Sequence, residues 1–392
     1  MNKPTVQDIF LKFYSDYLEK YTPSVEQAKV ANAIMNCKTS RMGANVQVCE
    51  DCGCISIHYN SCRNRCCPMC QALPKEKWMD MRKEDVLDAP YFHLVFTVPA
   101  ELNPIIYSNQ KLLYDTLYHA ASATINDLSV QDKYLGANVG YICILHTWGS
   151  ELNYHPHIHT ILLGGGLDKN RHWKDKGDKF FIPIQVISKV FRGKYMEELK
   201  SLWEAGKLKF FGSSERYQNR YEFKALLDTC YSKEWIPHCK RTFNGAQSVI
   251  KYLGKYTHRI AISNHRIILI NDESVTFSVK DYRNAGKWKN ITISGVEFIR
   301  RFLMHVPPKR FVRIRHYGLL CSRMKNSNLT LCRNHLGCKK YISELRNMTS
   351  SQILEHLWGF KVEVCKHCGG KIIDHHRQMP TFVCSLPNEN ID

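Results

Sequence analysis

The chain has 392 residues, of which 44% are hydrophobic, and it carries 55 Lys and Arg against 36 Asp and Glu, a formal net charge of +19. This length predicts two or three domains, and the apolar content excludes wholesale disorder. Because the sequence has neither a run of about 18 apolar residues nor a secretory signal, we expect a cytoplasmic protein with no membrane partner. The positive charge predicts a polyanionic partner, most simply nucleic acid.

The first predicted elements are two helices. Residues 5–21 place apolar side chains at helical spacing, and Ser24 is typical of the cap of a second helix that ends near Asn36. A cysteine-rich segment follows, with eight cysteines from Cys37 to Cys70. In a cytosolic chain, cysteines so closely spaced indicate metal binding and not disulfides.

Two C-x-x-C pairs define this segment, one at Cys49 and Cys52 and the other at Cys67 and Cys70. Two such pairs can present four thiolates tetrahedrally, so we predict one structural zinc site built from these four cysteines. Five other residues could form a second zinc site or be small buried groups: Cys37, Cys54, His58, Cys62 and Cys66. Arg63 and Arg65 lie between the pairs, where they could contact phosphates or simply be solvated.

The central part of the chain mixes strands and helices. Buried strands are predicted at 91–99, 139–148 and 157–163, and a hairpin at 266–270 and 275–279. Helices are predicted at 107–128, 188–203, 244–258 and 297–305. This order favours an α+β fold around an antiparallel sheet, with domains at 1–88 (helices and zinc ribbon), 89–320 (catalytic) and 321–392 (a Cys-rich, zinc-knuckle-like tail).

The tail contains one C-x-x-C pair, Cys365 and Cys368, followed by two glycines. This pattern predicts a further zinc site but supplies only half of its ligands. The other ligands could come from several residues of the same segment: Cys321, Cys332, Cys338, Cys384, His375 or His376.

Two groups of residues in the central part could support a reaction. His157 and His159 alternate on a predicted strand, so both imidazoles lie on one face and could bind one metal ion. Tyr252 and Tyr256 are four residues apart on a predicted helix, with Arg259 close to the same direction. Packed core aromatics would show the same tyrosine spacing.

Together these groups suggest cleavage of a phosphodiester. A phenol has a pKa near 10, so about 0.1% is ionised at neutral pH, and a divalent ion at the histidines would ease its attack. The product would be a covalent phosphotyrosine, which preserves the energy of the broken bond for rejoining.

At these residues the sequence resembles the two-tyrosine HUH transposases of the insertion sequence 91 family. The likeness runs through NSCRNRCCPMCQ, YFHLVFTVP, LHTWGSELNYHPHIHTILLGGG, YLGKYTHRIAISNHRI and EFIRRFLMHVPPKRFVRIRHYGLL. It implies rolling-circle-like transposition, with Mg²⁺ or Mn²⁺ on His157 and His159 and 5′-phosphotyrosine links at Tyr252 and Tyr256. One departure is Cys66, where the family usually has His.

HUH sites generally use a third polar ligand. If strands 139–148 and 157–163 form a hairpin, His146 lies across from the histidine pair, and we rank it first. Glu151, in the turn, ranks second. Gln247 ranks last, because it is about 140° around the helix from Tyr252.

A basic run near the end of the catalytic domain is a further candidate for DNA contacts. It contains Arg300, Arg301, Lys309, Arg310, Arg313 and Arg315, with Phe302, Phe311 and Tyr317 between them. Arginines suit phosphates and aromatics can stack on unpaired bases, although a solvated basic face would look similar.

The expected partner is single-stranded DNA of transposon ends and target, with host replication machinery as a further possibility. Two alternatives remain: a plasmid or phage replication initiator or relaxase with the same chemistry, and a zinc-dependent DNA-binding regulator without enzymatic activity.

Overall fold

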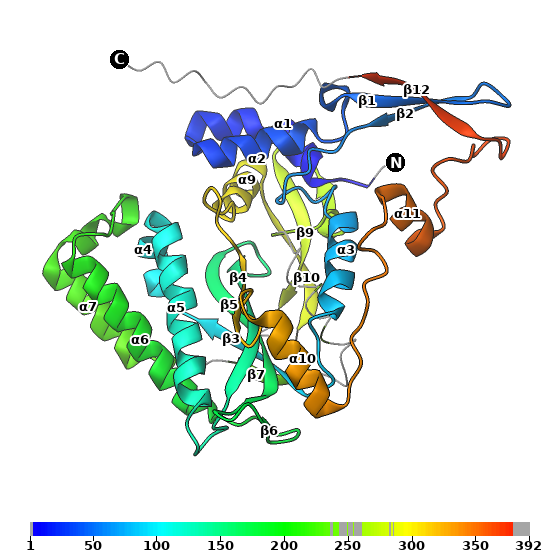
Figure 1. Cartoon of the computed structure of the whole chain (residues 1–392). Helices are drawn as coiled ribbons and strands as arrows, with labels where there is room; N and C mark the ends of the chain where they lie inside the picture. The colour runs from blue at the N-terminus through cyan, green and yellow to red at the C-terminus, as the bar shows by residue number, and fades with distance from the viewer. Residues whose placement is uncertain are drawn as a thin grey trace, which may run out of the picture.

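Antiparallel sheets organise the chain in the computed structural model, which describes residues 3–235, 238–242, 249, 254, 261–281, 284 and 286–378 (Figure 1). The largest sheet has the order β11-β4-β5-β3-β7, with β6 beside β5, and two three-stranded sheets have the orders β10-β9-β8 and β12-β1-β2. The strands are β1 (Ala44–Cys49), β2 (Ile55–Tyr59), β3 (Tyr91–Thr97), β4 (Asn138–Trp148), β5 (Tyr154–Leu167), β6 (Trp173–Asp175), β7 (His238–Thr242), β8 (Ile267–Ile270), β9 (Ser274–Asp281), β10 (Lys287–Ser294), β11 (Ile314–Gly318) and β12 (Ile372–Gln378).

Helices surround these sheets. They are α1 (Val6–Lys20), α2 (Val25–Asn36), α3 (Ala72–Lys83), α4 (Asn103–Ser108), α5 (Gln110–Ser129), α6 (Ile184–Glu204), α7 (Arg220–Ser232), α9 (Gly295–Met304), α10 (Lys325–Leu336) and α11 (Ser350–Trp358). The predicted α+β class with antiparallel sheets is confirmed. In the described part of the chain, no helix is both long and apolar enough to cross a membrane.

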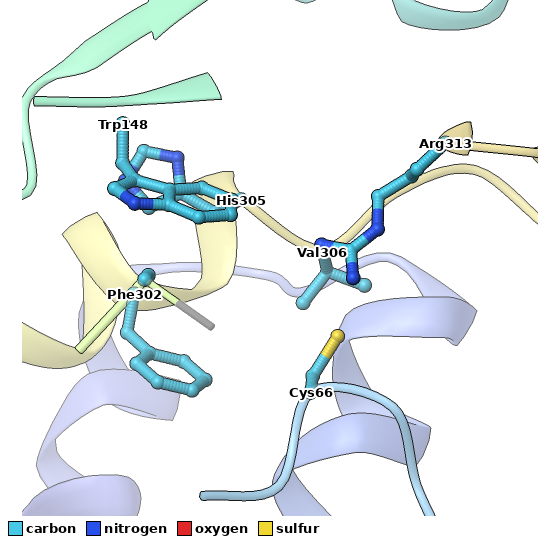
Figure 2. A pocket seen from close by; sticks show the side chains of 7 residues that line it. Cys66, Trp148, Phe302, His305, Val306 and Arg313 are labelled. Carbon is cyan, nitrogen blue, oxygen red and sulfur yellow. The ribbon is translucent and has the colours of Figure 1, made fainter. Parts of the chain in front are cut away.

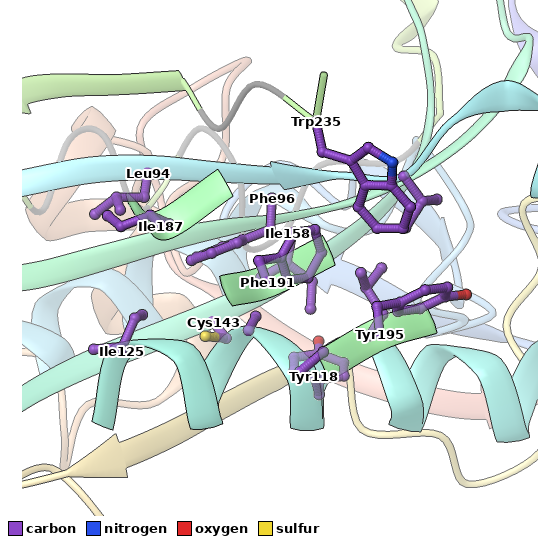
Figure 3. Packing of buried hydrophobic residues seen from close by; sticks show 14 of the residues in the cluster. Leu94, Phe96, Tyr118, Ile125, Cys143, Ile158, Ile187, Phe191, Tyr195 and Trp235 are labelled. Carbon is purple, nitrogen blue, oxygen red and sulfur yellow. The ribbon is translucent and has the colours of Figure 1, made fainter. Parts of the chain in front are cut away.

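One face of the large sheet packs on α5 and α6. Alternate residues of β3, such as Phe92, Leu94 and Phe96, lie in this core with Ile158 of β5 (Figure 3). Because side chains alternate across a strand, the residues between them point to the opposite face. Each fully buried apolar side chain contributes about 1.5–3 kcal/mol, so this core fixes which residues the opposite face presents.

The opposite face has its own apolar cluster, to which α10 contributes. It contains Tyr91 of β3, Ile142 and Ile144 of β4, and Ile161 of β5. Val249, whose neighbours in the chain lie outside the described residues, also belongs to it. Continuing the same alternation along β4 and β5 leads to His146, His157 and His159, so we call this side the histidine face.

The N-terminal helices pack on the smaller sheet β10-β9-β8 and on α9. Phe10 of α1 meets Phe302 of α9 edge to face, with 5.4 Å between ring centroids. A Cβ atom at Gly295 would lie 2.2 Å from the ring of Phe13, so α1 approaches α9 where only glycine fits. The predicted boundaries near residues 88 and 320 stay predictions, and packing contacts cross both.

Most predicted elements match the structure, with a few shifts. Ser24 caps α2 as expected, because its hydroxyl accepts from Gln27 N while the Gln27 amide oxygen accepts from Ser24 N. The helix predicted at 107–128 is divided at Asn109 into α4 and α5. The third strand begins at Tyr154, three residues earlier than predicted. The predicted helix at 244–258 lies outside the described residues except Val249 and Gly254.

Candidate histidine and cysteine metal sites

His157 and His159 lie side by side on β5. Both point from the histidine face, and their Nε2 atoms are 3.1 Å apart. The Nδ1 atom of His157 is 2.7 Å from the carbonyl oxygen of His155, so its Nε2 atom faces His159. His159 is buried, whereas His157 is half-buried, so the pair lies at the boundary between core and solvent.

His146 joins this pair through the β4–β5 hairpin. It is the direct register partner of His157, and its ring centroid is 4.6 Å from that of His159. One nitrogen from each of the three imidazoles lies within 4.8 Å of the other two. The structure therefore brings together the three residues that spacing suggested, although metal binding by them stays a prediction.

Glu151, the second choice for a third ligand, is placed differently. It lies in the hairpin turn, and its carboxylate is 3.2 Å from Nζ of Lys289. It is not part of the histidine group. Gln247, the last choice, lies outside the described residues.

His93 is a member of this site that the sequence analysis missed. It lies on β3 with its Nε2 2.8 Å from Nδ1 of His159, and the two rings stack 5.1 Å apart. The contact leaves Nε2 of His159 directed toward the other imidazoles. Alternation in YFHLVF places His93 on the same strand face as Tyr91, but the pairing of β3 with β5, which brings His93 to His159, cannot be read from the sequence.

The three clustered imidazoles fit a divalent ion by donor type and spacing. Neutral imidazole nitrogens bind divalent transition metals well. Since none of the three carries negative charge when neutral, a bound ion would retain its charge for a phosphate.

The candidate nucleophiles Tyr252 and Tyr256, and Arg259, lie outside the described residues. Two residues near Tyr252 in the chain are described. Val249 is only 2% exposed and belongs to the cluster on the histidine face. A Cβ atom at Gly254 would lie 1.8 Å from the sulfur of Met79, so this position approaches α3 closely.

The cysteines form two four-thiol groups, and their grouping differs from the prediction. Cys67 and Cys70 meet Cys37 and Cys62, with 3.6 Å between the sulfurs of Cys62 and Cys70. The prediction that Cys49, Cys52, Cys67 and Cys70 share one site is wrong in this respect. Spacing identified the C-x-x-C pairs, but it could not show that the hairpin β1–β2 separates them.

Cys49 and Cys52 instead meet the C-terminal pair Cys365 and Cys368. The remaining ligands proposed for the C-terminal site, among them Cys321, Cys332 and Cys338, are not in this group; Cys384 and the side chains of His375 and His376 lie outside what the structure describes. Cys54 is exposed and Cys66 is buried, and neither belongs to a group.

Most arginines proposed to bind DNA are engaged within the protein. Arg300 and Arg301 both bind Glu297, at 2.6 and 2.7 Å. Arg315 pairs with Asp115 and lies 4.0 Å from the Tyr118 ring centroid. Their DNA role stays a prediction, and each already has a partner within the protein.

The aromatic residues of the same run are not available to stack on bases. Phe302 is 2% exposed in the core that α1 shares with α9, and Phe311 is 3% exposed in the core beside α5 and α6. Tyr317 stacks on Tyr141, with 5.3 Å between centroids. Their spacing reflects packing, which corrects the expectation that they contact unpaired bases.

A small cavity lies between the end of β4 and the loop that contains Cys62–Cys70. Figure 2 shows Cys66 and Arg313 facing each other, with Trp148 and His305 beside them. Burial lowers the pKa of His305 to about 4, so this imidazole is neutral at pH 7. Arg63 and Arg65 are both exposed, and Arg65 donates to the carbonyl oxygen of Phe311 at 2.8 Å. The loop with Cys62–Cys70 therefore packs close to the histidine strand.

Comparisons with known proteins agree with this arrangement. The family model described as "Transposase zinc-binding domain" matches residues 9–98, and one described as "Putative transposase" matches residues 140–328. A Sinorhizobium fredii protein named "Putative transposase y4qJ" is 40% identical over 336 residues, 85% of this chain and 84% of that protein. The chain belongs to the insertion sequence 91 family of transposases. A second relative, "Transposase for insertion sequence element IS801" from Pseudomonas savastanoi pv. phaseolicola, is 26% identical over 76% of this chain and 71% of that protein.

No solved structure matches this transposase. The histidine cluster lies within the segment matched as transposase, and the group of Cys37, Cys62, Cys67 and Cys70 lies within the zinc-binding match. That match and the cysteine geometry support structural zinc in the protein. Cys365 and Cys368 lie beyond both matched segments.

Proposed function

We propose that this transposase nicks and rejoins single-stranded DNA at the histidine face, with Tyr252 and Tyr256 as nucleophiles. The observation that supports this most is the convergence of His146, His157 and His159 within 4.8 Å at the solvent boundary of the large sheet. Val249, three residues before Tyr252, belongs to the apolar cluster on that same face.

The chemistry is an in-line exchange at phosphorus. A tyrosine oxygen loses its proton and bonds to the phosphorus of the scissile phosphate, the bond from phosphorus to the 3′ oxygen breaks, and the departing oxygen takes up a proton, so the step is proton-neutral overall. Mg²⁺ or Mn²⁺ on the imidazoles of His146, His157 and His159 would polarise the phosphate and offset its charge. The 5′ end stays on the enzyme as phosphotyrosine, and a free 3′-OH is released.

Two nucleophiles would allow two successive transfers. The 3′-OH of a second strand can attack the phosphotyrosine, which restores a phosphodiester and frees the phenol. With Tyr252 and Tyr256 both available, one could hold the first DNA end while the other cuts the second. This is the requirement of a rolling-circle-like transposition that joins transposon ends to a target, in which host replication machinery could take part.

The charge of the chain fits this partner. A net +19 favours a polyanion, and we place the enzyme at bacterial DNA in the cytoplasm. A replication initiator or relaxase would share the strand chemistry, but the transposase relatives favour transposition. A DNA-binding regulator would lack metal-dependent nicking, so the experiment below separates it from an enzyme.

The test is the formation of a covalent protein–DNA adduct. Full-length protein is incubated with labelled single-stranded oligonucleotides from the element ends and Mn²⁺ or Mg²⁺, then run on a denaturing gel. We expect an adduct that chelation abolishes, that Tyr252→Phe/Tyr256→Phe lacks, and that His157→Ala/His159→Ala reduces at least 100-fold. Tyr221→Phe, which changes a phenol 83% exposed on α7, should behave as wild type. An adduct of unchanged yield in the double tyrosine variant would refute the proposal.

A further inference from the structure

The two ends of the described chain carry the same local motif. Cys49–Gly53 reads C-E-D-C-G and Cys365–Gly369 reads C-K-H-C-G. In both, the glycine has positive φ, +65° at Gly53 and +78° at Gly369, and its amide donates back to the first cysteine carbonyl. These are two tight turns of the same kind, and each presents a pair of sulfurs.

The four sulfurs meet at distances typical of a tetrahedral metal site. Those of Cys49 and Cys368 are 3.5 Å apart and those of Cys52 and Cys365 are 3.8 Å apart. Zn–S bonds of about 2.3 Å in a tetrahedron place sulfurs roughly 3.8 Å from one another. A disulfide would need about 2.05 Å, so these four cysteines are free thiols and not disulfide partners.

Backbone amides prepare the C-terminal pair for a cation. The amide of His367 is 3.4 Å from the sulfur of Cys365, and that of Gly370 is 3.4 Å from the sulfur of Cys368. The thiolate is the form that binds metal, so these bonds favour coordination.

The strands beside the sulfurs are joined as well. β1 pairs antiparallel with β12, from Ala44 opposite Gln378 to Cys49 opposite Ile372 (Figure 1). Next to the sulfurs, the amide of Glu50 donates to the carbonyl oxygen of Lys371 at 2.9 Å. A Cβ atom at Gly370 would lie 2.0 Å from the Asp51 carboxylate, so the two turns interlock closely.

We propose that Cys49, Cys52, Cys365 and Cys368 bind one zinc ion that clasps the C-terminal segment to the N-terminal zinc module. This clasp is a second zinc site, distinct from the group of Cys37, Cys62, Cys67 and Cys70. Half of its ligands lie outside the zinc-binding match at residues 9–98. The first and last of its cysteines are separated by 319 positions, so the ion closes a very long segment of chain.

The clasp also completes a polar groove between the β12-β1-β2 sheet and α11. β1 and β12 both contribute to its wall, and Gln47 Nε2 donates to Asp374 at 2.7 Å across the two strands. The polar side chains along the groove include those of Asn45, Gln47, His58, Ser350, Asp374 and Arg377, and Val362 also lines it. Without zinc at the clasp, we expect β12 to leave the sheet and this groove to open.

Zinc content of the full-length protein tests the shared site. Zinc per chain is measured by mass spectrometry for wild type, Cys49→Ser/Cys52→Ser, Cys365→Ser/Cys368→Ser and the combined fourfold variant. We expect each to lose the same single zinc, so that the fourfold variant has one fewer than wild type and not two. Cys54→Ser, which removes an exposed thiol of the same hairpin, should retain the wild-type content. Loss of two ions in the fourfold variant, or of none in the C-terminal one, would overturn the clasp.

Hydrogen exchange provides a second readout that depends on neither activity nor global unfolding. Amides in 372–378, and those amides in 44–49 that face β12, should exchange at least tenfold faster in both double variants, because β12 loses its pairing with β1 while β1 keeps its pairing with β2. Amides of β4 and β5 should stay protected, which shows that the variants have folded. If removal of the N-terminal pair left 372–378 fully protected, the two ends would not be clasped by a shared ion.

Discussion

At the residue scale, His93 orients a proposed metal ligand. Its Nε2 is 2.8 Å from Nδ1 of His159, so the pair fixes which nitrogen of His159 faces the cluster. Loss of such a partner typically lowers metal affinity by about 10–100-fold. We expect His93→Gln to raise the Mn²⁺ concentration for half-maximal adduct formation by roughly that factor, with the yield largely restored at saturating Mn²⁺.

Direct Mn²⁺ titration by paramagnetic resonance separates positioning from a general structural defect. The titration should show the same weakening of binding in the absence of DNA. His119→Gln, which changes a largely exposed histidine on α5, is the control and should match wild type. An unchanged Mn²⁺ affinity in His93→Gln would show that His93 only fills the core.

Residues close in sequence could be predicted, and residues joined by distant strands could not. His157 and His159 follow from alternation on one strand, and His146 follows from one hairpin. His93 required knowing that β3 pairs with β5, whose registers are set by packing on α5 and α6. The group that joins Cys49 and Cys52 to Cys365 and Cys368 required the pairing of β1 with β12, which no local pattern of residues indicates.

At the element scale, Asp80 of α3 holds the segment that precedes α11. Its carboxylate is buried and accepts from Tyr341 at 2.6 Å, Ser343 at 2.7 Å and the amide of Leu345 at 2.9 Å. Burial alone would raise the pKa of Asp80, but the hydrogen bonds from Tyr341, Leu345 and Ser343 outweigh it and lower the pKa to about 2. The ionised carboxylate therefore docks residues 341–345 on α3.

This pKa gives an acid-dependent stability with a defined sign. Between about pH 4 and pH 2, the carboxyl group of Asp80 binds a proton more readily in the unfolded state than in the folded state. Its contribution to the free energy of unfolding is therefore complete above pH 4 and is lost toward pH 2. We expect Asp80→Asn to lower the free energy of unfolding by about 2 kcal/mol at pH 7 and by much less at pH 2.

Urea unfolding of wild type and variant at several pH values measures this difference. Subtracting the stability–pH curve of the variant from that of wild type cancels the contribution of other carboxylates that titrate in the same range. One of these is Glu297, whose pKa is lowered to about 2 by its bonds to Arg300 and Arg301. Asp88→Asn, at an exposed position shortly after α3, should change stability little at any pH. A destabilisation by Asp80→Asn that is equal at pH 7 and pH 2 would contradict the assignment.

The secondary structure was more predictable than the packing of the elements. Helices α1, α2, α6 and α9 and strands β3, β4, β8 and β9 follow from periodicity and caps in the sequence. β12 was not expected, because IIDHHRQ has no clear alternation and gains its order from β1. Similarly, the packing of α1 on α9 joins segments almost 300 residues apart, through glycine and aromatic contacts that become evident only in three dimensions.

At the scale of the whole molecule, the loop between α9 and β11 joins the zinc module to the histidine strand. Arg65 donates to the carbonyl oxygens of Pro308 and Phe311 in this loop. On the other side, the backbone amide of Leu145, next to His146, donates to the carbonyl oxygen of Arg313. Lys309 and Arg310 are exposed at the tip of this loop and form no ion pair with any residue that the structure describes. We therefore predict that this tip, whose cations are exposed, contacts the phosphates of a DNA strand bound at the proposed site.

Salt dependence of DNA binding tests this placement. For single strands, each phosphate contact contributes about 0.7 to the slope of log affinity against log salt. We expect Lys309→Ala/Arg310→Ala to flatten that slope by about 1.4, measured by fluorescence anisotropy with an end-derived oligonucleotide. Arg220→Ala/Lys224→Ala removes the same charge from exposed positions on α7, at the outer edge of the molecule, and should leave the slope nearly unchanged (Figure 1). If DNA lies along this loop, fewer counterions are released on binding when Lys309 and Arg310 are removed, and the slope changes only in that variant. Equal slopes for the two variants would mean that only the total charge attracts DNA.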